Sequence, residues 1–196
     1  MKLAPLSLLP LACLAACSSF QAVKPEPLVQ GVSAHLGERD IEDSNELDGL
    51  GKLGTVGVQY DGRAPHAALG WELALFQSED TADLPGGSLE ARVTELAGGV
   101  RKTFEPGQLG VRGLYPYVGG GLSLLFTERE LRSPGMPDAN DEDLDAGVYV
   151  HAGVYGRFFD HLRIGVDYRL VREEFLDTGG FDLDGDQLAL TLGVSF

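Results

Sequence analysis

Apolar and polar residues alternate with a period of two along much of the chain, most regularly at its end. In 187–196 the apolar positions are Leu188, Leu190, Leu192, Val194 and Phe196. The same alternation occupies 148–155 and 162–170. Because successive side chains of a β-strand point to opposite faces, each segment has one apolar face and one polar or glycine-rich face. Segments of about ten such residues match a tilted strand that crosses a membrane.

Five further segments follow this pattern less regularly, at 28–39, 53–60, 66–77, 88–104 and 114–127. In the third of them, Trp71 and Leu73 alternate with Glu72 and Ala74. The chain has 27 glycines, and many of them recur in these segments. Glycine in a strand relieves crowding where a narrow barrel curves. The eight segments together predict an all-β protein, an eight-stranded antiparallel up-and-down transmembrane β-barrel.

The connections between these segments alternate in length. Short ones are expected at 61–65, 105–107 and 159–161, and long polar ones at 40–52, 78–87, 128–145 and 175–185. Outer-membrane barrels have short periplasmic turns and long external loops. The order predicts both ends of the barrel on the periplasmic side and four long loops outside.

Two water-soluble folds share the alternation. A lipocalin-like barrel also has eight strands, but its apolar side chains face inward, and alternation does not say which face is outside. The polar set here is charged and rich in glycine, so it favours an interior of polar groups. A soluble β-sandwich would not explain the order of the connections.

The first residues are typical of an export signal. Lys2 precedes an apolar run, Leu3 to Leu14, that is too short to span a bilayer as a helix. Leu14-Ala15-Ala16-Cys17 resembles the lipobox of bacterial lipoproteins, a resemblance of four residues. It implies a signal peptide at 1–16, an acylated Cys17, a tether at 17–27 and a barrel domain at 28–196. An ordinary signal peptide with two incidental cysteines, Cys13 and Cys17, is the alternative.

Two stretches, 117–121 and 190–196, resemble the OmpA/OmpX-like superfamily of small outer-membrane barrels. In that family, an aromatic C-terminal residue after alternating apolar residues is the signal read by the barrel-assembly machinery. The resemblance implies this role for Leu190, Leu192, Val194 and Phe196. It also implies that the protein is located in the outer membrane of a Gram-negative bacterium, with the lipid on Cys17 anchored on the periplasmic side.

Charged residues on the polar faces are expected to fill the interior. An eight-stranded barrel is just wide enough for side chains, so buried charges must pair with one another. The predicted interior ion-pair network consists of Glu72, Glu95, Arg101, His151, Arg157, Arg163, Asp167 and Arg169. We interpret it as a structural plug without an open pore. A gated conduction path or a proton-sensitive switch at His151 is the alternative.

Acidic residues are concentrated in four windows, 38–48, 79–83, 128–145 and 173–186. These hold 22 of the 30 acidic residues and only three basic ones, and the net charge of −15 argues against nucleic-acid binding. Divalent cations are possible partners of the acidic loops. Asp182, Asp184 and Asp186 are weak candidate ligands, as is the cluster at 138–145, because neither has the full spacing of a calcium loop.

Catalytic chemistry has little support in the sequence. His35, His66 and His151 are expected to point inward and His161 to lie in a turn, and none has the serine partner that a lipid hydrolase needs. No G-x-S-x-G motif is present. We therefore predict no catalytic residues and no cofactor.

Aromatic residues are expected at the two membrane boundaries. Tyr60, Phe104, Phe158 and Phe159 lie beside short turns, and Trp71, Phe76, Phe126 and Tyr168 are assigned to the opposite boundary. The predicted function is a non-enzymatic outer-membrane barrel with a structural or surface-interaction role, whose partners are membrane lipid and lipopolysaccharide. A lipid-modifying enzyme and a narrow channel are the alternatives.

Overall fold

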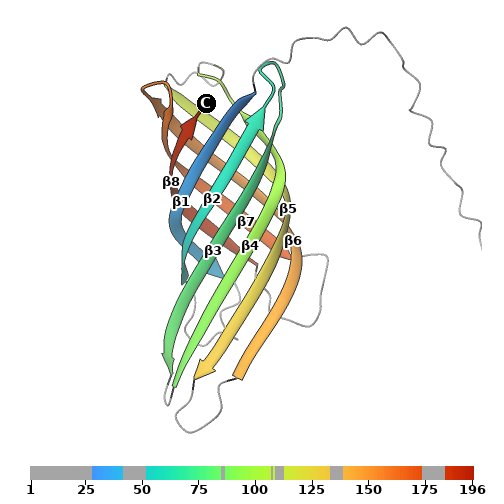
Figure 1. Cartoon of the computed structure of the whole chain (residues 1–196), viewed down its shortest axis with the longest axis vertical. Helices are drawn as coiled ribbons and strands as arrows, with labels where there is room; N and C mark the ends of the chain where they lie inside the picture. Colours follow the sequence, from blue (N-terminus) through green and yellow to red (C-terminus); the bar gives the residue numbers. More distant parts are fainter. Residues whose placement is uncertain are drawn as a thin grey trace, which may run out of the picture.

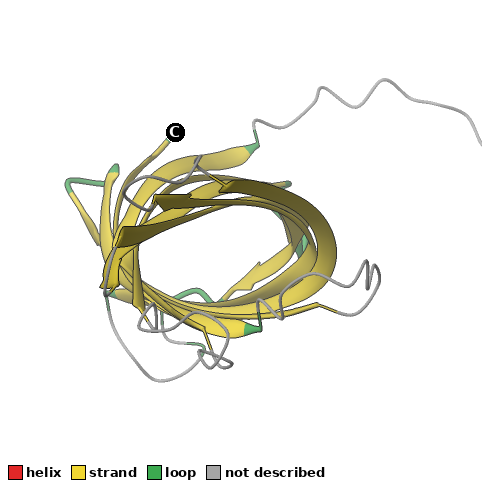
Figure 2. Cartoon of the chain, turned by 90° about the horizontal axis from the view of Figure 1, so that it is seen from below, coloured by secondary structure: helices red, strands yellow, loops and turns green. Residues whose placement is uncertain are grey.

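The computed structural model describes residues 28–41, 52–84, 87–106, 108, 113–132, 139–173 and 184–196. The eight strands are β1 (Val29–Ile41), β2 (Lys52–Arg63), β3 (Gly70–Leu84), β4 (Gly87–Thr103), β5 (Leu114–Arg132), β6 (Ala139–Phe158), β7 (Leu162–Glu173) and β8 (Gly185–Ser195). Each pairs with its sequence neighbours in antiparallel fashion, and β8 pairs with β1 to close the barrel (Figures 1 and 2). The predicted fold class is confirmed. The predicted leader, Cys17 and the tether lie outside the described residues.

The two faces of the barrel have opposite chemistry. Apolar side chains such as Leu36, Leu122 and Leu190 point outward and are about two-thirds exposed, at 65%, 64% and 66%. Charged side chains such as Glu95 and Asp167 point inward and are at most 1% exposed. A water-soluble barrel would reverse this arrangement, since large exposed apolar surfaces mark contact with lipid or another partner. The lipocalin-like alternative is therefore excluded.

The connections alternate between the two ends of the barrel, but their lengths do not alternate as predicted, because two residues join β3 to β4 and ten join β4 to β5. The β2–β3, β4–β5 and β6–β7 connections share one end with the start of β1 and the end of β8, which we call the short-turn end (top of Figure 1). The β6–β7 turn is the tightest. There Phe159 and Asp160 have positive φ angles of 52° and 63°, and His161 N donates to Phe158 O.

At the other end, β3–β6 extend past their neighbours. The pairing of β3 with β2 ends at Gly54↔Glu79, and that of β6 with β7 begins at Gly147↔Glu173. We call this extension (79–84, 87–92, 127–132 and 139–146) the projecting sheet; it is the lower end of Figure 1. At 19 and 20 residues, β5 and β6 are about twice as long as a membrane crossing requires.

The projecting sheet corrects two predictions. Most of the expected loops 78–87 and 128–145 is strand, because β3 continues to Leu84 and β5 to Arg132. A strand that extends beyond the hydrocarbon layer does not need an apolar face, so its sequence can resemble that of a loop. The other long connections are where they were predicted, but residues 42–51 and 174–183 lie outside the described residues.

Three side chains lie elsewhere than predicted. β3 begins at Gly70 rather than 66, so His66 lies exposed in the β2–β3 connection. Trp71 contacts Tyr60 with ring centroids 4.9 Å apart and belongs to the short-turn end. Phe76 is 1% exposed inside the barrel, because even-numbered residues of β3 point inward.

None of the described residues forms a helix long and apolar enough to cross a membrane.

Candidate functional site

The charged side chains of the interior form three clusters along the barrel axis. The cluster nearest the projecting sheet is centred on Glu95 of β4. Its carboxylate accepts hydrogen bonds from Arg39 of β1 at 3.1 Å and Arg169 of β7 at 2.7 Å. Arg169 also lies over the rings of Tyr149, 3.7 Å from its centroid, and Phe76, at 5.0 Å. All these groups are buried, so the ion pairs replace their hydration.

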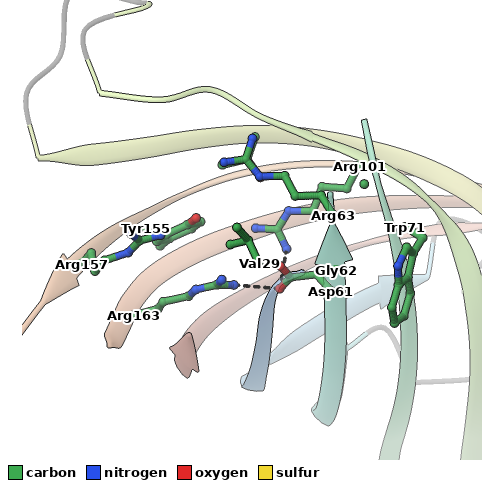
Figure 3. Close-up of a pocket in the computed structure, with 11 residues that line it drawn as sticks. Val29, Asp61, Gly62, Arg63, Trp71, Arg101, Tyr155, Arg157 and Arg163 are labelled. Atoms are coloured by element: carbon green, nitrogen blue, oxygen red, sulfur yellow. Dashed lines mark hydrogen bonds and ion pairs between the residues drawn. The ribbon is translucent and has the colours of Figure 1, made fainter. Parts of the chain in front are cut away.

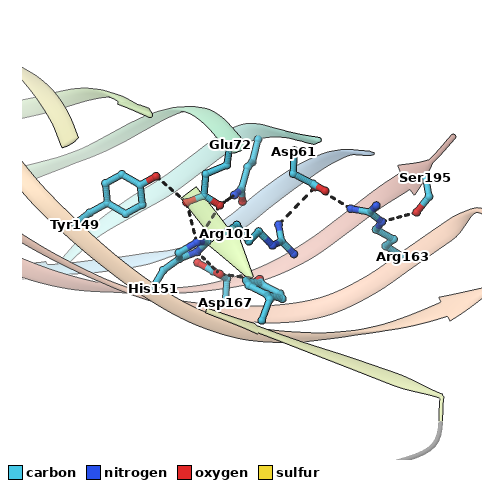
Figure 4. A network of polar contacts seen from close by, with 10 residues as sticks. Asp61, Glu72, Arg101, Tyr149, His151, Arg163, Asp167 and Ser195 are labelled. Atoms are coloured by element: carbon cyan, nitrogen blue, oxygen red, sulfur yellow. Dashed lines mark hydrogen bonds and ion pairs between the residues drawn. The ribbon is translucent and has the colours of Figure 1, made fainter. Parts of the chain in front are cut away.

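The central cluster is built around His151 of β6 (Figure 4). Its Nε2 lies 3.1 Å from Glu72 Oε2 and its Nδ1 lies 2.9 Å from Asp167 Oδ2. Tyr149 donates to Glu72, and Tyr117 donates to Asp167, each at 2.7 Å. Because both ring nitrogens face carboxylates, both can donate only when the ring is an imidazolium. When the ring is protonated, the cluster is a buried cation held between two anions.

Glycine makes room for this arrangement. A Cβ added to Gly119 of β5 would lie 2.3 Å from His151 Nε2, and one added to Gly153 would lie 2.3 Å from the ring of Tyr117. Neither contact is possible without moving the side chain. The small residues on β5 and β6 therefore set the positions of the histidine and the tyrosine.

The third cluster lies at the short-turn end. Asp61 of β2 accepts from Arg163 of β7 at 2.8 Å and from Arg101 of β4 at 3.5 Å. Arg163 Nε also donates to Ser195 Oγ on β8. Arg101 lies over the ring of Tyr117, 3.6 Å from its centroid, which connects this cluster to the central one.

All eight residues predicted for the interior network point into the barrel, but they do not form a single network. Arg157 joins only by stacking on Tyr115, with its guanidinium 4.5 Å from the ring centroid. Sequence reasoning missed several partners: Arg39, Asp61, Tyr117, Tyr149, Ser195 and also Gln59, whose Nε2 donates to Glu72 Oε2 at 2.9 Å. Their inward direction could have been predicted from their odd or even positions along each strand, because each lies on the inward face. Their partners could not be predicted, because each contact joins strands across the barrel and no local pattern in the sequence indicates it.

The arrangement has little capacity for acid–base catalysis. His151 is 5% exposed and both its nitrogens are occupied. The ring nitrogens of His35 have no hydrogen-bond partner among the described residues, and the ring packs edge-on against Phe76. Cavities of about 10 and 20 Å³ lie between the central cluster and the short-turn end, each with room for about one water molecule.

The candidate cation ligands are divided between different environments. Asp182 lies outside the described residues, Asp184 pairs with Arg172 at 3.4 Å, and Asp186 lies on β8. In the 138–145 cluster, Glu142 is exposed whereas Asp145 is buried inside the barrel, since neighbouring strand residues face opposite ways. Within the described ranges, no group of three or more potential metal ligands comes together.

A closed eight-stranded barrel with an apolar outside and a charged inside is a transmembrane β-barrel. Residues 9–196 match the model of the outer membrane protein beta-barrel domain, and the chain belongs to this family. No curated protein sequence matches the chain.

Solved outer-membrane barrels have the same fold. A major outer membrane protein from Thermus thermophilus aligns with a TM-score of 0.66 at 14% identity, covering 87% of this chain and 100% of that one. OprG from Pseudomonas aeruginosa gives 0.57 at 14% identity, covering 86% and 94%. Ail of Yersinia pestis, in complex with the heparin analogue sucrose octasulfate, gives 0.55 at 10% identity, covering 86% and 97%. At such identities the similarity concerns the fold.

Proposed function

We propose that this protein is a non-enzymatic, non-conducting outer-membrane barrel that presents an acidic surface outside the cell. The filled interior carries this proposal. From the Glu95 cluster to the Asp61 cluster, oppositely charged groups pair across the barrel, and the cavities between the central cluster and the short-turn end have room for about one water each. Ion flow would require breaking these pairs, which costs several kcal/mol each.

Electrical recording tests the closed interior. The folded protein in planar bilayers is expected to give no stable conductance steps. A Glu72→Ala, Asp167→Ala double variant, which removes both anions beside His151, is the matched comparison for an opened interior. Stable steps from the unmodified protein would contradict the proposal and favour the narrow channel. Altered lipid A acylation on expression would favour an enzyme.

The projecting sheet is the proposed interaction surface. In outer-membrane barrels the short turns face the periplasm, so this sheet would stand outside the membrane. Its exposed basic groups are already engaged by carboxylates: Arg92 lies 3.5 Å from Glu79 and 3.7 Å from Glu128, and Arg132 lies 2.7 Å from Glu130. Because Glu79, Glu128 and Glu142 are also exposed on this sheet, the surface suits cationic ligands, or lipopolysaccharide phosphates bridged by divalent cations.

The structure of Ail in complex with a heparin analogue provides a direct contrast. A sulfated polyanion would be repelled by the acidic surface proposed here. Barrels in nanodiscs should show no binding to immobilised heparin and salt-sensitive binding to immobilised polylysine. An Asp80→Lys, Glu128→Lys, Glu142→Lys variant should weaken the polylysine interaction. Heparin binding by the unmodified barrel would refute the proposed surface chemistry.

A lipid on Cys17 is the second part of the proposal, supported by the lipobox resemblance. An acyl chain would hold the N-terminus in the periplasmic leaflet, on the side where β1 begins. Labelling cells with a clickable palmitate analogue should mark the protein. Cys17→Ala should abolish the label, whereas Cys13→Ala, which changes a residue of the predicted leader, should keep it. Equal labelling of both variants would refute acylation at Cys17.

A further inference from the structure

Three arginines point into the barrel at its short-turn end, where the sequence offers few anions. Arg157 of β6 and Arg163 of β7 are direct cross-strand partners, and Arg101 reaches the same space from β4 (Figure 3). Like charges placed opposite each other in a sheet are destabilising. Such a cluster therefore persists where another group compensates its charge.

The nearby carboxylates compensate only part of this charge. Asp61 is shared between Arg163 and Arg101. Glu105 pairs with Arg63 at the rim, and Asp167 is taken up by His151 and Tyr117.

Within the part of the chain that the structure describes, no ion pair involves Arg157. Three guanidinium groups thus face one carboxylate, which leaves an excess of two positive charges, and Arg157 is the group without a contacting anion.

Aromatic rings hold these guanidinium groups in place. Arg157 stacks on Tyr115, Tyr115 is stacked on Tyr155 with a centroid distance of 5.1 Å and an interplanar angle of 4°, and Arg163 lies 5.0 Å from Tyr155. Stacking occupies the face of a guanidinium and leaves its in-plane N–H donors available. This is how arginine is prepared to bind a planar or tetrahedral oxyanion.

A small cavity lies between the three side chains. It has a volume of about 20 Å³ and is also lined by Gly62 and Gly70, which contribute no side chains. Arg101 and Arg163 are 7% and 3% exposed, so the walls are built rather than formed by mobile surface groups. The space accepts one water-sized group, which fits a single oxygen of an oxyanion whose remaining atoms lie at the rim.

We propose that this cavity binds a phosphate group. A phosphate carries one to two negative charges, which match the excess at the cluster, and it accepts several charge-assisted hydrogen bonds from arginine. Two sources present this chemistry at the short-turn end, free phosphate and the phosphodiester of a phospholipid in the adjacent leaflet. The site is distinct from the acidic surface at the other end of the barrel.

Calorimetry on the full chain, folded in dodecyl maltoside without phosphate, tests the site. Titrated inorganic phosphate should bind saturably, and Arg157→Gln should weaken binding about ten-fold or more. Arg157→Lys keeps the positive charge but lacks the paired N–H donors of the guanidinium, so it should lose less phosphate affinity than Arg157→Gln. Arg172→Gln, which alters an arginine at the opposite end, is the matched control and should bind like the unmodified protein.

Mass spectrometry of the intact protein separates the two sources. A phospholipid that stays bound to the unmodified barrel through detergent exchange, and leaves the Arg157→Gln variant, would identify the lipid headgroup. Saturable phosphate heat without retained lipid would identify free phosphate. Absence of both, or equal phosphate binding by the unmodified protein and Arg157→Gln, would overturn the proposal. A heat-dependent shift in gel mobility verifies that each variant is folded.

Discussion

Replacing Glu95 by glutamine tests whether the buried charges stabilise the barrel. The change keeps the shape of the side chain but removes the charge that faces Arg39 at 3.1 Å and Arg169 at 2.7 Å. At an effective dielectric constant of about 20, each contact provides about 5–6 kcal/mol of Coulomb attraction. Desolvation and repulsion between the two guanidinium groups offset part of it. Removing one partner of a buried pair costs about 3–5 kcal/mol, which is the expected fall in the free energy of unfolding.

Equilibrium unfolding by urea in phospholipid vesicles measures this loss. Trp71 is the only tryptophan, and its partly exposed side chain reports departure from the lipid boundary through its fluorescence. Glu128→Gln is the control, because Glu128 is 61% exposed and lies 3.7 Å from Arg92, so its loss should cost less than about 1 kcal/mol. If Glu95→Gln costs no more than this control, the interior pairs do not stabilise the barrel as argued.

Three further changes have expected outcomes. Gly119→Ala should lower the free energy of unfolding in urea by about 1–3 kcal/mol, because the added Cβ would overlap His151. Gly54→Ala, whose added Cβ has its nearest contact at 3.8 Å, should be close to neutral. Equal effects of the two changes would contradict the packing argument. Asp160→Gly should raise stability by about 1 kcal/mol by relieving a positive φ, and a fall would show that the side chain matters more. Hydrogen bonds from Arg132 lower the pKa of Glu130 below its ordinary value of 4.5, so their ion pair is present at neutral pH and is lost only as pH falls through that lowered pKa. NMR titration should show this midpoint returning toward 4.5 in Arg132→Gln; an unchanged midpoint would assign the shift to another cause.

The central cluster illustrates what sequence reasoning could reach at the site. Parity along each strand placed Glu72, His151 and Asp167 inside, because side-chain direction in a strand depends only on local alternation. It did not indicate that His151 contacts both carboxylates, because Glu72 lies 79 residues from it in sequence. Phe76 shows that parity outweighs residue type, since this aromatic ring faces inward against the boundary position assigned to it.

The number of strands, their antiparallel order and the face of each that meets lipid could all be predicted from the order of residues. These properties follow from a period of two, from the connections between the alternating segments and from the charged residues on one face of each strand, all of which are local. Two others needed the folded chain: how far β3–β6 continue beyond β2 and β7, and the placement of Arg157 opposite Arg163 while Asp61 serves two arginines. Those features depend on the register between strands and on distances across a closed barrel, which bring together residues that no local pattern connects.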